Sequence, residues 1–181
     1  MNDGLVPQRY AKALYKHAVA HNNAAQVYEE MKVASAVFAQ NPALQKTLSN
    51  PFVSREDKEK LLLAAVGDNA DKDYRSFVSL ILDHNREDFA WRMTLAYQKI
   101  YREANRISRV EIIMANPLPD YQLEKIRQVV GNAFPGRSFE FSEKVDQSLI
   151  GGFVIDVDSV RMDASISNEI EQLRQKLLSS N

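Results

Sequence analysis

The chain has 181 residues, which is enough for one large domain or two small ones. Charged residues make up 26% and nearly cancel, with a formal net charge of −1, so nucleic acid is not expected as the main partner. The absence of cysteine excludes disulfides, thiolate metal sites and a cysteine nucleophile. No apolar run approaches the roughly 20 residues that cross a bilayer, and no secretory signal precedes Arg9. We therefore expect a soluble protein whose link to any membrane is indirect.

The first part of the chain predicts helices throughout, because its apolar residues recur at helical spacing. Ser54, with Asp57 three residues further on, predicts one helix start, and Asp71 predicts the next. Residues 77–82 are apolar on nearly every side and predict the central helix of a bundle. Residues 86–105 predict a long last helix.

The pattern changes to strands and shorter helices near residue 105. Apolar and polar residues alternate in 110–114 and again in 138–142, which predicts two strands. A third and a fourth strand are predicted within residues 153–162, joined by a turn at Asp158. A helix beginning at Asp120 separates the first two strands.

The last predicted helix begins with Ser165 as its cap and carries apolar residues on one face. These residues are Ile166, Ile170, Leu173 and Leu177. We expect this stripe to cover the apolar side of the small sheet. Together the patterns predict an all-α N-terminal domain, residues 1–105, and a small α+β C-terminal domain, residues 106–181.

A double glycine, Gly151-Gly152, lies between two apolar runs. Such a pair indicates backbone that bends sharply or approaches a neighbour closely. The plainest interpretation is a tight turn that leads into a β-hairpin. A phosphate-binding loop is excluded, because the next helix begins too far away and no Lys-Ser/Thr pair is present.

The chain shows no catalytic, cofactor-binding or metal motif. His17 and His21 are four residues apart, so a helix places both on one face, where they could share a metal ion. No further ligand motif accompanies them, and a pair on a helix surface or in a groove is the favoured interpretation. Adjacent acids such as Glu30, beside Glu29, and Glu87, beside Asp88, point apart on a helix and predict solvated faces. We expect neither enzyme activity nor a cofactor.

The first predicted helix is apolar over more than one face, with Tyr10, Ala13 and Leu14 among its residues. One explanation is a position buried inside the bundle. The other is a groove that binds an amphipathic helix of a partner protein.

Four segments resemble the delta subunit of F-type rotary ATP synthase, which in mitochondria is called the oligomycin-sensitivity-conferring protein. Residues 9–15, Arg-Tyr-Ala-Lys-Ala-Leu-Tyr, resemble the start of its first helix. Residues 41–62 and 84–86 resemble two further family segments. Residues 145–153, Val-Asp-Gln-Ser-Leu-Ile-Gly-Gly-Phe, resemble its C-terminal signature, the most specific of the four.

One short segment departs from the family. Asp163-Ala164-Ser165 stands where the family usually has Asp-Gly-Ser. Ser167 and Glu169 stand where arginines often follow.

The resemblance implies a six-helix N-terminal bundle, a smaller C-terminal domain and no catalytic residues. It implies a stator subunit that joins the catalytic head to the peripheral stalk, so that proton-driven rotation is coupled to ATP synthesis. The implied place is the cytoplasmic face of a bacterial inner membrane, reached only through the complex.

The resemblance also implies two partners. The N-terminal helix of an alpha subunit would lie in a groove between the first and fifth helices; carried over to this chain, its lining is Tyr10, Ala13, Leu14, His17, Phe77, Leu80 and Ile81. The C-terminal end of the b subunit would meet the C-terminal domain, on the side of Gly151, Gly152, Ile166, Ile170, Leu173 and Leu177.

Two alternatives remain from the residues alone. The first is a free-standing adaptor whose bundle binds some other amphipathic helix. The second is a small enzyme with a site between the domains, against which the lack of a nucleophile–base set argues.

Overall fold

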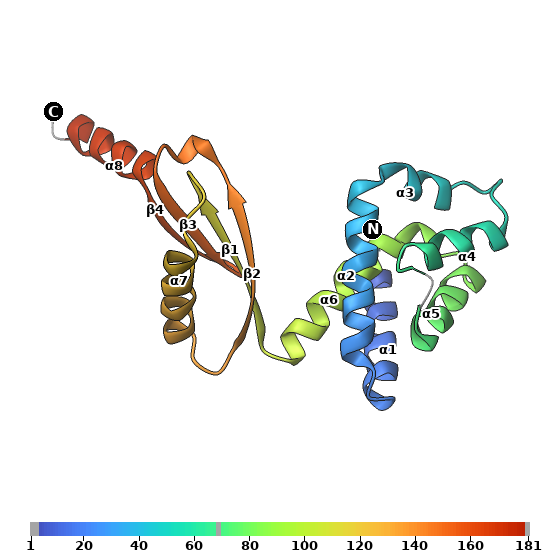
Figure 1. Ribbon diagram of the computed structural model, residues 1–181. Helices are drawn as coiled ribbons and strands as arrows, with labels where there is room; N and C mark the ends of the chain where they lie inside the picture. Colours follow the sequence, from blue (N-terminus) through green and yellow to red (C-terminus); the bar gives the residue numbers. More distant parts are fainter. Residues whose placement is uncertain (1–3, 68–69, 180–181) are drawn as a thin grey trace. The chain divides into compact units, whose positions relative to one another are not determined.

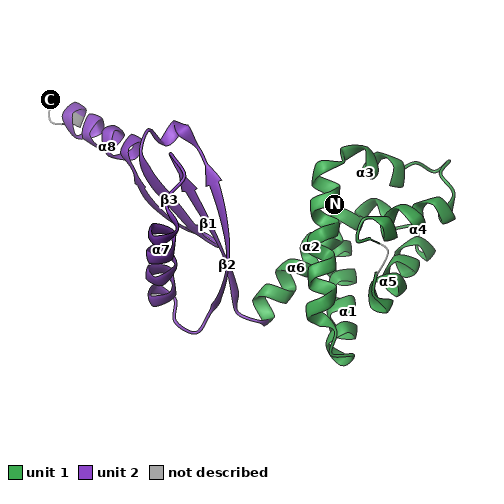
Figure 2. Ribbon diagram, viewed as in Figure 1, with its two compact units in different colours: residues 1–104 green, residues 105–181 purple. Residues whose placement is uncertain are grey.

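The computed structural model describes residues 4–67 and 70–179 (Figure 1). The chain divides into two compact units, residues 1–104 and 105–181 (Figure 2). Each unit has a hydrophobic cluster of its own. Among the described residues, no helix combines the length and the apolar character needed to cross a membrane.

The first unit is helical. In chain order it contains α1 (Leu5–Ala20), α2 (Ala24–Gln40), α3 (Pro42–Leu48), α4 (Arg55–Ala64), α5 (Lys72–Asp83), the 3-10 turn η1 (Glu87–Phe89) and α6 (Ala90–Ala104). The two predicted helix starts are confirmed. Ser54 Oγ accepts the Asp57 N–H at 3.1 Å, and Asp71 Oδ1 accepts the Asp73 N–H at 2.8 Å. Each bond satisfies a backbone donor that the first helical turn leaves without a partner.

The predicted central helix is not the one at the centre of this unit. α6 packs along both α1 and α2, with Met93 and Tyr97 completely buried. α5 buries Phe77 and Ile81 but leaves Leu80 41% exposed. The prediction that residues 77–82 form the central helix is therefore wrong, because one side of α5 faces solvent.

The second unit is a four-stranded sheet with helices. Its elements are β1 (Ile107–Met114), α7 (Asp120–Ala133), β2 (Ser138–Val145), the 3-10 turn η2 (Gln147–Leu149), β3 (Gly152–Val157), β4 (Val160–Ser165) and α8 (Ile166–Ser179). The strand order is β2-β1-β3-β4, with β1 parallel to β2 and antiparallel to β3, and β3 antiparallel to β4. The predicted strands and the turn at Asp158 are confirmed, and the strands are longer than predicted.

One face of this sheet is covered by α7, not by α8. Buried residues of β1, such as Val110 and Ile112, cluster with Leu123, Ile126 and Val130 of α7. The apolar stripe of α8 is instead exposed. Its members have exposed fractions between 44% and 72%: Ile166, Ile170, Leu173 and Leu177. The expectation that this stripe covers the sheet is wrong, because α7 already occupies the apolar face.

Candidate partner-binding surfaces

The helices α1 and α5 lie antiparallel along a shared line of contact, which we call the α1–α5 seam. At one end, the rings of Tyr10 on α1 and His84 after α5 are 6.1 Å apart and meet edge to face. At the other end, His17 Nε2 on α1 lies 3.2 Å from Asp73 Oδ1 on α5. The seam therefore brings the start of α1 beside the end of α5, and the end of α1 beside the start of α5.

The seven residues expected to line a groove lie on α1 and α5, and they differ in burial. Leu14, Phe77 and Ile81 are at most 5% exposed and belong to the core of the unit. Tyr10 is half-buried. The exposed members are Ala13, His17 and Leu80.

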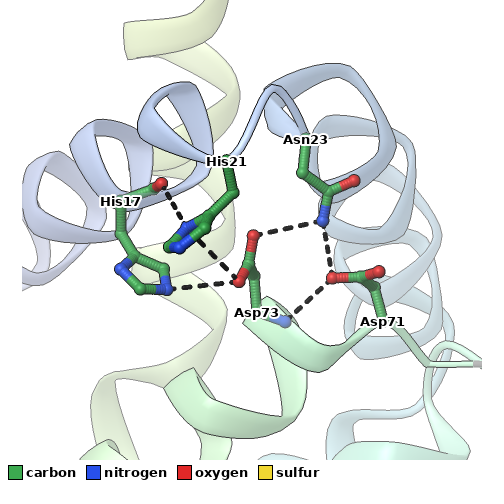
Figure 3. A network of polar contacts seen from close by, with 5 residues as sticks. All are labelled: His17, His21, Asn23, Asp71 and Asp73. Carbon is green, nitrogen blue, oxygen red and sulfur yellow. Dashed lines mark hydrogen bonds and ion pairs between the residues drawn. The ribbon is translucent and has the colours of Figure 1, made fainter.

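A network of polar contacts lies at the end of the seam where α1 ends and α5 begins (Figure 3). Asn23 Nδ2 donates to Asp71 Oδ1 at 2.6 Å and to Asp73 Oδ2 at 3.1 Å. His21 Nδ1 donates to the carbonyl oxygen of His17 at 2.9 Å and lies 3.9 Å from Asp73 Oδ1. These contacts tie the turn after α1 to the first turn of α5.

Two acids predicted to lie on solvated faces are in fact mostly buried. Glu30 is 7% exposed, and its Oε1 accepts the Asp71 N–H at 2.7 Å, while its Oε2 is buried without a hydrogen-bond partner. Burial raises the pKa of Glu30, because the charged carboxylate is less well solvated there. Glu87 accepts from Lys58 Nζ at 2.6 Å, in a pair whose side chains are 12% and 8% exposed. The sequence pattern missed both because their partners lie far along the chain.

In the second unit, the double glycine forms the junction between the sheet and α8. Gly152 is the first residue of β3, has a φ of 75° and pairs with Ser165 of β4. A β-carbon on Gly152 would collide with the carbonyl oxygen of Ala164. Both interpretations of the double glycine are confirmed: the turn before Gly152 leads into the β3–β4 hairpin, whose own turn lies at Asp158, and the backbone of Gly152 closely approaches that of β4.

The first turn of α8 is held by this junction. The Ile166 N–H donates to the carbonyl oxygen of Gly151 at 3.0 Å. Ser165 Oγ accepts the Asn168 N–H at 3.3 Å, which confirms the predicted cap. Asp163 Oδ1 accepts both the Oγ–H and the N–H of Ser165, at 2.6 and 2.9 Å, and these bonds lower the pKa of Asp163.

Beyond that first turn, α8 presents its apolar stripe to solvent. Leu178 beside the stripe is also exposed. Several large apolar side chains on one exposed helical face are typical of a surface that binds another protein.

Nearly the whole chain matches one protein family. The family model described as ATP synthase delta (OSCP) subunit matches residues 6–177. Among curated relatives, "ATP synthase subunit delta" of Phocaeicola vulgatus is 34% identical over 98% of this chain and 96% of its own length. The protein of the same name from Parabacteroides distasonis is 35% identical over 98% of both chains. That of Nostoc punctiforme is 31% identical over 97% of this chain and 95% of its own length.

A solved structure shares the fold. One chain of the cryo-EM structure of the Toxoplasma gondii mitochondrial ATP synthase hexamer aligns with a TM-score of 0.69 at 19% identity. The alignment covers 95% of this chain and 97% of that chain. On the family match over residues 6–177 and the curated relatives, this chain belongs to the ATP synthase delta (OSCP) family, the non-catalytic stator subunits of the membrane-associated ATP synthase.

Proposed function

We propose that this subunit links the catalytic head of ATP synthase to its peripheral stalk at the cytoplasmic face of a bacterial inner membrane. The observation that supports the proposal is that each unit has a helical surface of its own with exposed apolar side chains. One is the α1–α5 seam, and the other is the stripe of α8. A subunit that joins two bodies needs two separate attachment surfaces.

The α1–α5 seam is proposed to bind the amphipathic N-terminal helix of an alpha subunit. Ala13 is small, so a helix can approach the seam closely there, while Leu80 offers an exposed apolar contact. Tyr10 and His17 would flank these contacts, and the buried Leu14, Phe77 and Ile81 would form the floor. The helices α1 to α6 would then be the six-helix bundle of the family.

The stripe of α8 is proposed to bind the C-terminal end of the b subunit. Gly151 and Gly152 allow the sheet and the first turn of α8 to approach each other, which fixes where the helix leaves the sheet. Ile166, Ile170, Leu173 and Leu177 would then pack against an apolar face of the stalk. We further propose that the two units are separate domains with their boundary near residue 105.

The proposal is tested with two fluorescent peptides, one from the alpha N-terminus and one from the b C-terminus of the same organism. Each is titrated with the full-length chain, alone and with the other peptide present at saturation. We expect both peptides to bind together, because the surfaces lie on different units. Competition between the peptides would contradict the two-surface proposal. Failure of both to bind, with capture of an unrelated amphipathic helix, would favour a free-standing adaptor.

A further inference from the structure

We propose that His17, His21 and Asp73 form a binding site for a divalent transition-metal ion of the zinc type. One potential ligand atom from each of the three side chains lies within 4.8 Å of the other two. His17 and His21 come from the last turn of α1 and the residue after it, and Asp73 comes from the first turn of α5 (Figure 3). The proposed site stands on this geometry and does not depend on the proposed partners.

The spacing of the ligand atoms suits a small tetrahedral ion. Two ligands bound to zinc at roughly 2.0–2.1 Å in tetrahedral geometry are about 3.4 Å apart. His17 Nε2 and Asp73 Oδ1 are 3.2 Å apart, so an ion can bridge them with little movement. The side chains of His17 and His21 are 51% and 56% exposed, which leaves their rings room to turn and leaves water access to a fourth position.

Neighbouring groups already orient the ligands. His21 Nδ1, which lies 3.9 Å from Asp73 Oδ1, donates to the carbonyl oxygen of His17, so a metal ion would bind Nε2 of the neutral ring, or Nδ1 once that hydrogen bond is released. Asn23 Nδ2 binds Asp73 Oδ2 and leaves Oδ1 facing the two histidines. Metal-binding histidines and carboxylates are commonly held by hydrogen bonds of this kind.

The ligand set selects the class of ion. Two imidazoles and one carboxylate suit zinc and its neighbours, whereas calcium and magnesium prefer oxygen ligands. The carboxylate of Asp71 accepts from Asn23 and from the Asp73 N–H, so a further acidic group lies beside the Asp73 ligand. A bound ion would join α1 to α5 at one end of the seam and would stabilise the first unit, because it binds the folded state.

The test uses the full-length chain and three single variants. Zinc binding is measured by titration calorimetry, and the geometry is read from the visible absorption of Co²⁺ in the same site. We expect one ion per chain, a tetrahedral Co²⁺ spectrum and a melting temperature that rises with zinc. His17→Ala and His21→Ala should each weaken binding at least about tenfold. Without metal, each should change the melting temperature only slightly, since both side chains are about half exposed and contacts of exposed charged groups contribute little to stability.

His84→Ala is the matched control, because His84 is the one other histidine of the chain and lies outside the cluster. It should bind zinc as the unchanged chain does. Asp73→Asn should weaken binding as the histidine variants do, and its folding is checked by circular dichroism. The proposal is overturned by an absence of saturable binding below the millimolar range. It is overturned equally by binding that survives the loss of either cluster histidine, or by full affinity in folded Asp73→Asn.

Discussion

The backbone of Gly152 lies so close to the carbonyl oxygen of Ala164 that a β-carbon on residue 152 would overlap that oxygen. Gly152 also has a φ of 75°, a conformation that costs residues with a β-carbon about 1–2 kcal/mol. Gly152→Ala should therefore lower the free energy of unfolding of the second unit by more than this strain alone. Hydrogen exchange of the β3 amides in the full-length chain measures the effect.

Gly136 provides the control for this substitution within the same unit. It has a φ of 77°, but a β-carbon there would meet nothing within 4 Å. Gly136→Ala should cost only the backbone strain, about 1–2 kcal/mol. Equal costs at the two glycines would contradict the close approach between Gly152 and Ala164.

Replacing only one partner of the buried Lys58–Glu87 pair should lower the free energy of unfolding of the first unit. Lys58→Met leaves the Glu87 carboxylate buried and unpaired, which costs typically about 3–5 kcal/mol. The double variant Lys58→Met/Glu87→Met should recover most of that loss, because no buried charge remains. Urea unfolding followed by the fluorescence of Trp91, the single tryptophan of the chain, reports on the first unit.

An exposed pair on α6 is the matched control. Lys99 and Glu103 are 70% and 66% exposed and 3.8 Å apart. Lys99→Met should change the free energy of unfolding by about 0.5 kcal/mol or less. A small effect of Lys58→Met, similar to that of Lys99→Met, would show that water solvates the Lys58–Glu87 pair.

Glu30 should make the stability of the first unit depend on pH. Burial raises the folded-state pKa of Glu30 above its ordinary value of 4.5, so the folded state holds the proton more tightly than the unfolded state does. The tighter proton binding by Glu30 in the folded state increases the free energy of unfolding. This increase is present in full below pH 4.5 and is lost as the pH rises through the raised pKa. The free energy of unfolding should thus fall over that window.

Glu30→Gln removes the titrating group and keeps an oxygen that can accept the Asp71 N–H. Its urea unfolding, followed at a series of pH values by Trp91 fluorescence, should lack the fall assigned to Glu30. A pH profile identical to that of the unchanged chain would assign the fall to other groups.

Ala13→Leu should weaken the binding of the alpha peptide more than it weakens folding. Ala13 is exposed on the seam, so a larger side chain there does not overpack the core but occupies the place of an approaching helix. Overpacking at a contact costs typically about 1–3 kcal/mol, and the affinity should fall by about tenfold or more. Ala36→Leu, at an exposed alanine of α2, should bind as the unchanged chain does. A large loss of thermal stability in Ala13→Leu with unchanged binding would argue against the seam as the binding surface.

Leu173→Glu/Leu177→Glu should abolish binding of the b peptide and leave the fold intact. Both leucines are more than half exposed, so charges there should scarcely affect folding of the free chain. Burying a leucine contributes about 1.5–3 kcal/mol, so the affinity should fall by about 100-fold or more. Gln172→Glu/Gln175→Glu adds the same charge on another face of α8 and should bind normally. Unfolding of the second unit in the leucine variant would show that the stripe packs within the chain.

Local patterns in the sequence predicted the parts of the fold that depend on neighbouring residues. The caps at Ser54 and Asp71 were predictable because a cap and its backbone donor are two or three residues apart. The placement of Asp73 beside His17 was not predictable, because it depends on how α1 and α5 pack. The burial of Glu30 was missed for the same reason, since its partner lies 41 residues away.

The surface against which α8 packs could not be predicted from the sequence. The apolar stripe of α8 was recognisable from the helical spacing of three and four residues alone. That spacing predicts a buried face but does not say whether the covering surface belongs to the same chain. α7 was a second candidate to cover the apolar face of the sheet. Its Leu123, Ile126 and Val130 also recur at helical spacing, and in the structure they pack against that face.

The strand directions of the second unit have a mechanical consequence. β1 and β4 point the same way, because each is antiparallel to β3, which lies between them. The chain therefore enters the sheet at one end of β1 and leaves at the opposite end of β4, where α8 begins. A tensile load between residue 105 and α8 would slide the strands past each other lengthwise. Inter-strand hydrogen bonds run across the strands, so this load shears many of them at once and does not unzip them one by one.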